Sequence, residues 1–287
     1  MDYKMAIQYG VNTWVWTSPL TTAGARELIP KVKAMGFDLF EIPLEAPSLL
    51  DAVTVRQLLA DHGLAVSVCG AFGPTRDLSS DDAGTVINAL DYIHRCLVFC
   101  RDVGARIFAG PMYSAVGKAR LLPPDERKAE FDRSVAGMKE VAVMAVDHGV
   151  TLGIEPLNRF ETDMVNTAAQ AVAMCDAIGH PAAQIMLDGF HMNIEETNIA
   201  EAIKLAGPRL CHAQVSDSHR GAPGAGLMRW DQFKAGLEAI SYDGAVVIES
   251  FTPGVKEIAR AAAIWRPLAA SQDALAQDGL KFLRGLL

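Results

Sequence analysis

The sequence lacks the features of a secreted or membrane-spanning protein. It contains five cysteines, an odd number without a CxxC pair, so we expect buried, reduced thiols rather than disulfides or a zinc site. No uncharged stretch is long enough to cross a bilayer, and the first residues do not show the charged-then-apolar pattern of a signal peptide. We therefore expect a cytoplasmic protein without a membrane partner.

Positive charge is scarce as well. The net charge is −8 at pH 7, and no run of basic residues interrupts this balance. Such a chain repels a phosphate backbone, so we expect no nucleic-acid partner. Internal repeats, linkers and low-complexity tracts are also missing, and the composition is that of an ordinary globular domain. We expect a single domain over residues 1–287.

Short apolar runs alternate with helical patterns along the whole chain. The clearest helical patterns cover residues 124–148 and 81–103, the second with Ser79, Ser80 and Asp81 as possible caps. Eight runs are predicted to be strands: residues 6–16, 39–44, 65–72, 106–111, 151–156, 184–187, 210–215 and 245–250. A doubly wound sheet would usually show a glycine-rich phosphate turn, which is missing here, so we predict an α/β fold with a single (β/α)8 TIM barrel.

Four oxygen-bearing side chains stand at the ends of the last four apolar runs. They are Glu155, Asp188, Gln214 and Glu249. Each alone could be a strand end that faces water, but the strands of a barrel all end on one face, so we expect the four to converge. Three carboxylates would repel one another without a cation, and hard oxygen donors suit Mn²⁺, Mg²⁺ or Co²⁺. The sequence therefore predicts one divalent metal ion per subunit, with Mn²⁺ as the first choice.

Several segments resemble a known family of enzymes. They cover residues 153–161, 187–196, 216–226 and 247–251, together with the loop at 73–81. These segments are similar to the xylose isomerase-like sugar isomerases and epimerases, and most of all to the D-tagatose 3-epimerase branch. The resemblance extends over nearly the whole chain.

The resemblance implies roles for the residues that end the strands. Glu155, Asp188 and Glu249 match three metal-ligand positions of the family, and Gln214 falls at the fourth. The tagatose epimerase branch usually has histidine at that fourth position, whereas the hydroxypyruvate isomerase branch has glutamine. This departure leaves the metal preference and the substrate open. His212 shares a strand face with Gln214 and is expected either to support the metal site or to be a core histidine.

The resemblance also implies substrate contacts by Glu161, His191 and Arg220. Arg220 can donate in a fork to hydroxyl and carbonyl oxygens, and His191 can donate to an oxygen that gains negative charge. Arg220 lies in the glycine-rich segment 216–229, which we expect to form a loop over the barrel mouth. Four apolar residues are expected to form a wall for the sugar: Trp14, Trp16, Phe72 and Met112.

The activity implied is that of a metal-dependent ketose 3-epimerase acting on free ketoses of the D-tagatose, D-psicose or L-ribulose type. Glu155 and Glu249 would be the catalytic pair, which removes and returns the proton at C3 through a metal-stabilised cis-enediolate. An aldose–ketose or hydroxypyruvate-type isomerase on the same metal site is the main alternative. An abasic-site endonuclease and a non-catalytic sugar-binding barrel are further ones. The resemblance also implies a homodimer or homotetramer.

Overall fold

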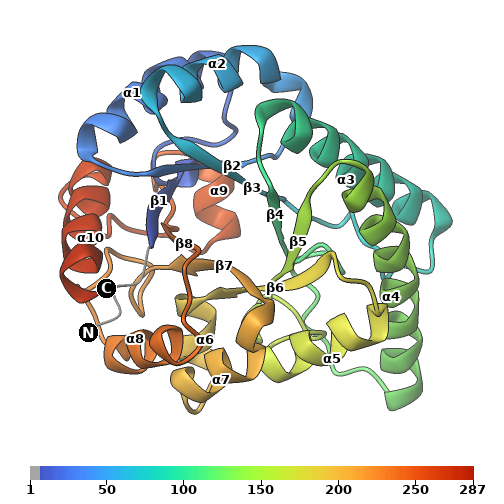
Figure 1. The fold of residues 1–287 in the computed structure, drawn as a ribbon. Helices are drawn as coiled ribbons and strands as arrows, with labels where there is room; N and C mark the ends of the chain where they lie inside the picture. The colour runs from blue at the N-terminus through green and yellow to red at the C-terminus, as the bar shows by residue number, and fades with distance from the viewer. Residues whose placement is uncertain (1–6) are drawn as a thin grey trace.

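The computed structural model describes residues 7–287, in which eight parallel strands close into a barrel in chain order (Figure 1). Each strand pairs with the next, and β8 pairs with β1. The predicted TIM barrel is therefore confirmed. The strands are β1 (Gln8–Asn12), β2 (Leu39–Pro43), β3 (Ala65–Cys69), β4 (Ile107–Gly110), β5 (Thr151–Ile154), β6 (Ala183–Asp188), β7 (Leu210–Val215) and β8 (Ala245–Ile248).

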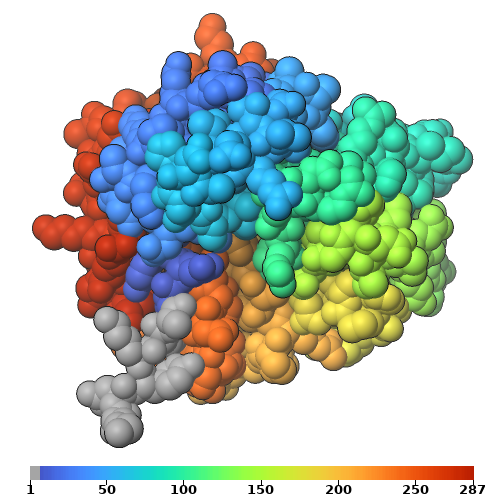
Figure 2. All heavy atoms as spheres, turned by 45° about the horizontal axis from the view of Figure 1, so that its top comes forward, coloured from blue at the N-terminus to red at the C-terminus, as the bar shows by residue number. Residues whose placement is uncertain are grey.

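Helices surround the strands (Figure 1), and on the face drawn in Figure 2 segments that follow one another in the chain lie side by side. Three short 3-10 helices also occur, namely η1 (Thr13–Val15), η2 (Pro47–Leu49) and η3 (Gly207–Arg209). The α-helices are α1 (Thr22–Met35), α2 (Ala52–His62), α3 (Ala83–Val103), α4 (Pro124–Asp147), α5 (Ala168–Ile178), α6 (Gly189–Glu195), α7 (Ile199–Ala206), α8 (Trp230–Ala239), α9 (Lys256–Ala261) and α10 (Gln272–Leu286). Every helix among residues 7–287 falls short of the combined length and hydrophobicity that a bilayer crossing demands.

Most element boundaries differ from the prediction by one or more residues, and side-chain caps explain two of them, the end of β1 and the start of α3. β1 ends at Asn12, whose side-chain oxygen accepts a hydrogen bond from the Trp14 N–H and starts η1, so the strand does not continue to Trp16. Ala6, where the predicted strand began, lies outside the described residues. The α3 helix is capped by Asp82, which accepts from the Thr85 N–H, and not by the three residues before it.

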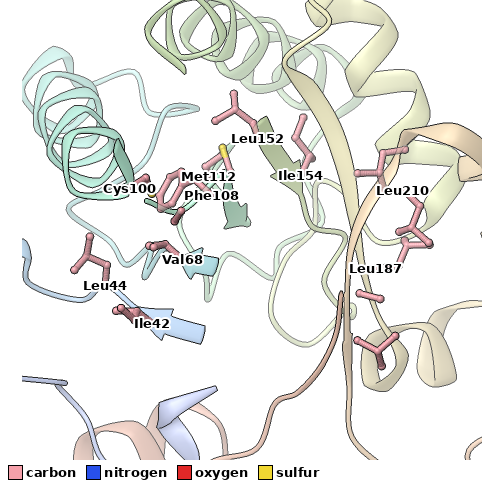
Figure 3. Close-up of a cluster of buried hydrophobic side chains, with 14 of the residues drawn as sticks. Ile42, Leu44, Val68, Cys100, Phe108, Met112, Leu152, Ile154, Leu187 and Leu210 are labelled. Atoms are coloured by element: carbon pink, nitrogen blue, oxygen red, sulfur yellow. The ribbon is translucent and has the colours of Figure 1, made fainter. Parts of the chain in front are cut away.

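Side chains along the strands alternate between the helix layer and the barrel interior. Buried apolar residues that face the helices come from neighbouring strands and from α3, as Figure 3 shows for Ile42, Val68, Phe108, Leu152 and Cys100. A separate apolar cluster closes the floor of the barrel interior, and it consists of Leu39, Ala245 and Val247 with Ala65. Above this floor the interior positions become polar, which places functional groups at the carboxyl ends of the strands.

The glycine-rich segment after β7 is a fixed loop. The Asp217 carboxylate accepts hydrogen bonds from the backbone N–H groups of Ser218 and Met228 and from the Trp230 indole N–H. Gly224 has a φ of 84°, and a Cβ atom there would collide with the ring of Phe282 on α10. The loop therefore depends on a residue without a side chain for its contact with the last helix.

Gly224→Ala should lower the free energy of unfolding by roughly 1–3 kcal/mol, because alanine is strained at this φ and clashes with Phe282. Urea or thermal unfolding measures this change. Gly285→Ala is the matched control: this exposed residue in α10 has open space around its Cβ position, so alanine should be neutral or stabilise by up to about 1 kcal/mol. Equal stability of the two variants would contradict the proposed contact.

Candidate active site

A pocket of about 410 Å³ opens at the carboxyl end of the barrel. Six of the seven predicted site residues line it: Glu155, Glu161, His191, Gln214, Arg220 and Glu249. The seventh, Asp188, is buried and contacts Arg220. The structure thus brings all seven together, although they come from segments spread over about a hundred residues.

The apolar wall of the pocket is only partly the predicted one. Trp14 and Phe72 line the pocket, but Trp16 and Met112 do not. The Trp16 indole N–H instead donates to Asp273 on α10, and Met112 is fully buried. Other apolar lining comes from segments that were not predicted to contribute, namely Leu157, Phe251, Ile258 and Ala262. The prediction was therefore wrong for two of the four residues.

Arg220 is held in one place by backbone and side-chain contacts. Its backbone is in the left-handed region, with φ of 64°, and its carbonyl accepts a hydrogen bond from the Ser250 hydroxyl. The guanidinium lies 4.1 Å from the centre of the Phe190 ring. Its Nη1 atom is 2.5 Å from Asp188 Oδ2 and 3.0 Å from Glu249 Oε2. The buried guanidinium of Arg220 therefore bridges two of the predicted metal ligands, Asp188 and Glu249.

Burial and like charge act together on the carboxylates of the pocket. Burial is the main cause that raises the pKa of Glu155, and the neighbouring carboxylates of Glu249 and Asp188 raise it further. Burial likewise raises the pKa of Glu249, although Arg220 opposes the shift. Burial alone would lower the pKa of Arg220, but Asp188 and Glu249 outweigh it and raise the value. The site is therefore one that additional positive charge would stabilise.

Hydrogen-bond donors lie against both ring nitrogens of His191. Its Nδ1 atom accepts from the backbone N–H of Asn158 at 3.1 Å and from the Asn158 side-chain Nδ2 at 2.9 Å. The Asn158 amide is itself oriented, because its Oδ1 accepts from the Phe160 N–H and its Nδ2 also donates to Glu161. Burial lowers the pKa of His191, which favours the neutral ring. The Asn158 contacts favour a ring proton on Nε2, whereas the Arg220 Nη2–H, 3.1 Å from Nε2, favours a free lone pair there, so the two neighbours compete for the tautomer.

The tightest group of possible metal ligands is not the predicted one. Ligand atoms of Glu155, Asp188 and His191 lie within 4.8 Å of one another, so His191 joins this group and Glu249 does not. His191 Nε2 is 3.6 Å from Glu155 Oε1 and 3.7 Å from Asp188 Oδ2. An imidazole nitrogen that carries a proton can donate a hydrogen bond but cannot coordinate a metal. The Asn158 contacts therefore favour a donor role for His191.

Gln214 presents an oxygen to the site. Its Nε2 donates to the carboxylate of Glu41, and its buried Oε1 has no hydrogen-bond partner among residues 7–287. A buried carbonyl oxygen without a partner is costly unless a cation or another donor satisfies it. With the carboxylates of Glu155, Asp188 and Glu249, the site region contains four hard oxygen donors, the donor type that suits a divalent ion.

Glu41 is a residue of this region that the sequence reasoning missed. It is fully buried, and its carboxylate contacts both Gln214 and His212. Burial raises its pKa as the largest single effect, but His212 and the other donors outweigh this and lower the value. His212 is thus a buried histidine that contacts Glu41, which is compatible with both of its predicted roles. The sequence does contain a sign of this role: Glu41 is a charged residue between Phe40 and Ile42, in an otherwise apolar strand. Its side chain is at a position that faces the barrel interior.

Comparison with known proteins identifies the family of this chain. Residues 29–286 match the family described as xylose isomerase-like TIM barrel. A ketose 3-epimerase of Arthrobacter globiformis is 35% identical over 98% of this chain and 97% of its own length. A D-psicose 3-epimerase of Agrobacterium fabrum is 33% identical, over 90% of this chain and 92% of its own.

A solved structure gives the same result in three dimensions. The D-allulose 3-epimerase from Methylomonas sp. in complex with D-allulose superimposes with a TM-score of 0.92 and 30% sequence identity. The superposition covers 100% of this chain and 99% of that one. The family match, the full-length relatives and the closed barrel agree, and the chain belongs to the xylose isomerase-like TIM barrel family.

Proposed function

We propose that the protein is a divalent-metal-dependent ketose 3-epimerase that acts on free ketoses of the D-tagatose, D-psicose or L-ribulose type. The main observation is that Glu155 and Glu249 enter one buried pocket from the ends of β5 and β8, with β6 and β7 between them. Two carboxylates that reach a substrate from different sides can exchange a proton across its plane. The matched relatives are 3-epimerases of sugars, which supports this reaction.

Glu155, Asp188, Gln214 and Glu249 would hold one divalent ion per subunit, with Mn²⁺ as the first choice and Mg²⁺ or Co²⁺ as alternatives. The orphaned Gln214 Oε1 and the mutual repulsion of the carboxylates both support this set. When bound, the ion supplies Lewis-acid chemistry, since it acidifies the proton beside the substrate carbonyl and stabilises the enediolate charge.

The proton moves between carbon and the two glutamates. One carboxylate removes the C3 proton from one face of the ketose, and the carboxyl group on the other side returns a proton to the opposite face, which inverts C3. Burial of Glu155 and Glu249 favours their protonated forms, so accepting a proton from carbon is less unfavourable than it would be in water. The apolar wall around them keeps competing water out.

The remaining polar residues position the substrate. Arg220 and His191 both line the pocket, and the Arg220 Nη2–H is directed at His191 Nε2, 3.1 Å away. A substrate oxygen that replaces His191 in this contact can accept from the guanidinium as it gains negative charge, with His191 beside it. Glu161 can accept from a substrate hydroxyl, and Asn158 Nδ2 holds it at 2.8 Å.

An isomerase that moves the proton between C1 and C2 is the second candidate. Gln214 favours it, because the hydroxypyruvate isomerase branch shares glutamine at this position. An endonuclease fits less well with a net charge of −8, and a non-catalytic barrel fits less well with the intact carboxylates. We further propose a cytoplasmic homodimer or homotetramer with one domain per subunit.

Glu155→Gln and Glu249→Gln should each lower kcat by roughly 10²–10⁴-fold, because the amide cannot accept the proton. Steady-state kinetics on D-tagatose, D-psicose and L-ribulose measures the loss, and circular dichroism checks the fold. Glu140→Gln, on the exposed face of α4, is the matched control and should keep wild-type kinetics. Near-normal turnover by either pocket variant would reject the two-carboxylate mechanism.

Chelation should inactivate the protein, and Mn²⁺, Mg²⁺ or Co²⁺ should restore activity. The ion should also stabilise the fold, by roughly 3 kcal/mol when its concentration is about 100 times its Kd, because only the native state assembles the ligands. Thermal unfolding of chelated protein with and without Mn²⁺ measures this independently of turnover. Full activity and an unchanged Tm after exhaustive chelation would show that the site does not use a metal.

Turnover of a ketose in heavy water should place deuterium at C3, because the proton on the glutamates exchanges with solvent before it returns. Nuclear magnetic resonance of the products from a panel of ketoses locates the label. Deuterium at C1 or C2 with an aldose product would instead identify the isomerase. Incorporation at neither carbon, for every ketose of the panel, would contradict both candidates.

A further inference from the structure

Glu41 is a fully buried carboxylate on β2 that belongs to neither the predicted ligands nor the predicted substrate contacts. We propose that Glu41 is a positioning residue that fixes the side-chain amide of Gln214 with its carbonyl oxygen directed at the metal site. This inference rests on the proposed function, since it concerns the fourth ligand of the proposed ion.

The Glu41 carboxylate is itself immobilised by four donors. Oε1 accepts from Asn12 Nδ2 at 3.0 Å and from Gln214 Nε2. Oε2 accepts from the Ser67 hydroxyl at 2.8 Å and lies 2.6 Å from His212 Nε2. These partners come from β1, β3 and β7, so the carboxylate is fixed from three strands of the barrel interior. Its position is therefore set by the fold and not by the metal.

An amide has two ends of opposite polarity and nearly equal shape, so its orientation needs a cause. A carboxylate that accepts hydrogen bonds must face the NH2 end of Gln214. The reverse orientation would set the Gln214 oxygen against the Glu41 oxygen and would point two N–H donors at the proposed cation. Both contacts are repulsive, so Glu41 leaves only the orientation with Oε1 toward the pocket.

Burial strengthens the preference of the Gln214 amide for this orientation. Gln214 and Glu41 are both about 1% exposed or less, so water does not replace either partner. Gln214 Oε1 is left without any hydrogen-bond partner among residues 7–287, which is the state expected of an oxygen reserved for an ion. Residues that orient metal ligands in this way typically change metal affinity by about 10–100-fold when they are mutated.

The test is a double-mutant cycle read as metal affinity and not as activity. Glu41→Asp keeps the charge but withdraws the carboxylate from Gln214, and Gln214→Leu removes the amide that Glu41 would orient. The Kd for Mn²⁺ is measured by electron paramagnetic resonance, up to millimolar Mn²⁺, for wild type, the two single variants and the double variant. Ser67→Ala is the control, because Ser67 contacts Glu41 but has no hydrogen bond with Gln214.

Glu41→Asp should raise the Kd by about 10–100-fold in the wild-type background, but by less than about twofold in the Gln214→Leu background. Ser67→Ala should change it by less than about twofold. If Glu41→Asp fails to fold by circular dichroism without metal, Glu41→Gln replaces it in the same cycle. Glu41→Gln also removes a negative charge, which weakens Mn²⁺ binding in both the wild-type and the Gln214→Leu backgrounds. The inference is supported only by a larger loss of Mn²⁺ affinity in the background that retains Gln214.

An equal loss in both backgrounds, or no loss with Gln214 present, would overturn the role of Glu41 while leaving the metal site intact. A wild-type protein that binds no Mn²⁺, Mg²⁺ or Co²⁺ would instead overturn the proposed function, and the inference with it. The two failures are therefore distinguishable in one set of titrations.

Discussion

Repulsion among buried carboxylates is the constraint on which the rest of this site depends. Glu41, Glu155, Asp188 and Glu249 are all buried at one end of the barrel, where water screens them little. Arg220 contacts Asp188 and Glu249, and Glu41 is satisfied by four donors. Among residues 7–287, Glu155 has no ion pair with an arginine or lysine within 4 Å; His191 Nε2 lies 3.6 Å from its Oε1, and Arg220 acts on it from further away. A divalent cation is the group that would relieve the remaining repulsion, so the charge pattern itself argues for a metal.

The barrel explains how such a cluster can form without unfolding the protein. Interior positions alternate along each strand, and the lower ones are filled by Leu39, Ala245 and Val247, which close the floor. The apolar layer facing the helices supplies the hydrophobic stabilisation, so the few interior positions near the carboxyl ends are free to hold charge. Unfavourable electrostatics at the mouth is therefore offset by packing elsewhere in the fold.

Local patterns predict much of this architecture. Most of the features that they do not predict depend on contacts between residues far apart in the sequence, and the end of β1 is a local exception. The eight apolar runs and the residues that end the last four give the barrel and the candidate ligands. The early end of β1 could not be predicted, since an Asn12 side-chain hydrogen bond overrides the apolar run. Glu41 contacts partners about 170 residues away in sequence, and Nδ1 of His191 accepts from Asn158 on another segment. No local pattern reports such pairs, which is also why Trp16 was wrongly placed in the pocket wall.

Neighbouring hydrogen bonds, and not only residue type, decide what each polar group can do here. Asn158 donates to Nδ1 of His191 and so favours a proton on Nε2, while Glu41 occupies Nε2 of Gln214 and so leaves Oε1 an acceptor. Both choices follow from groups outside the reacting centre. They also bear on the charge: one divalent ion and the Arg220 guanidinium would together balance the three carboxylates proposed as ligands, whereas a fourth acidic ligand would add buried negative charge beside Glu41. A neutral amide at position 214 avoids this further charge, and in the proposed reaction the negative charge of the enediolate is the one that Arg220 and His191 would receive.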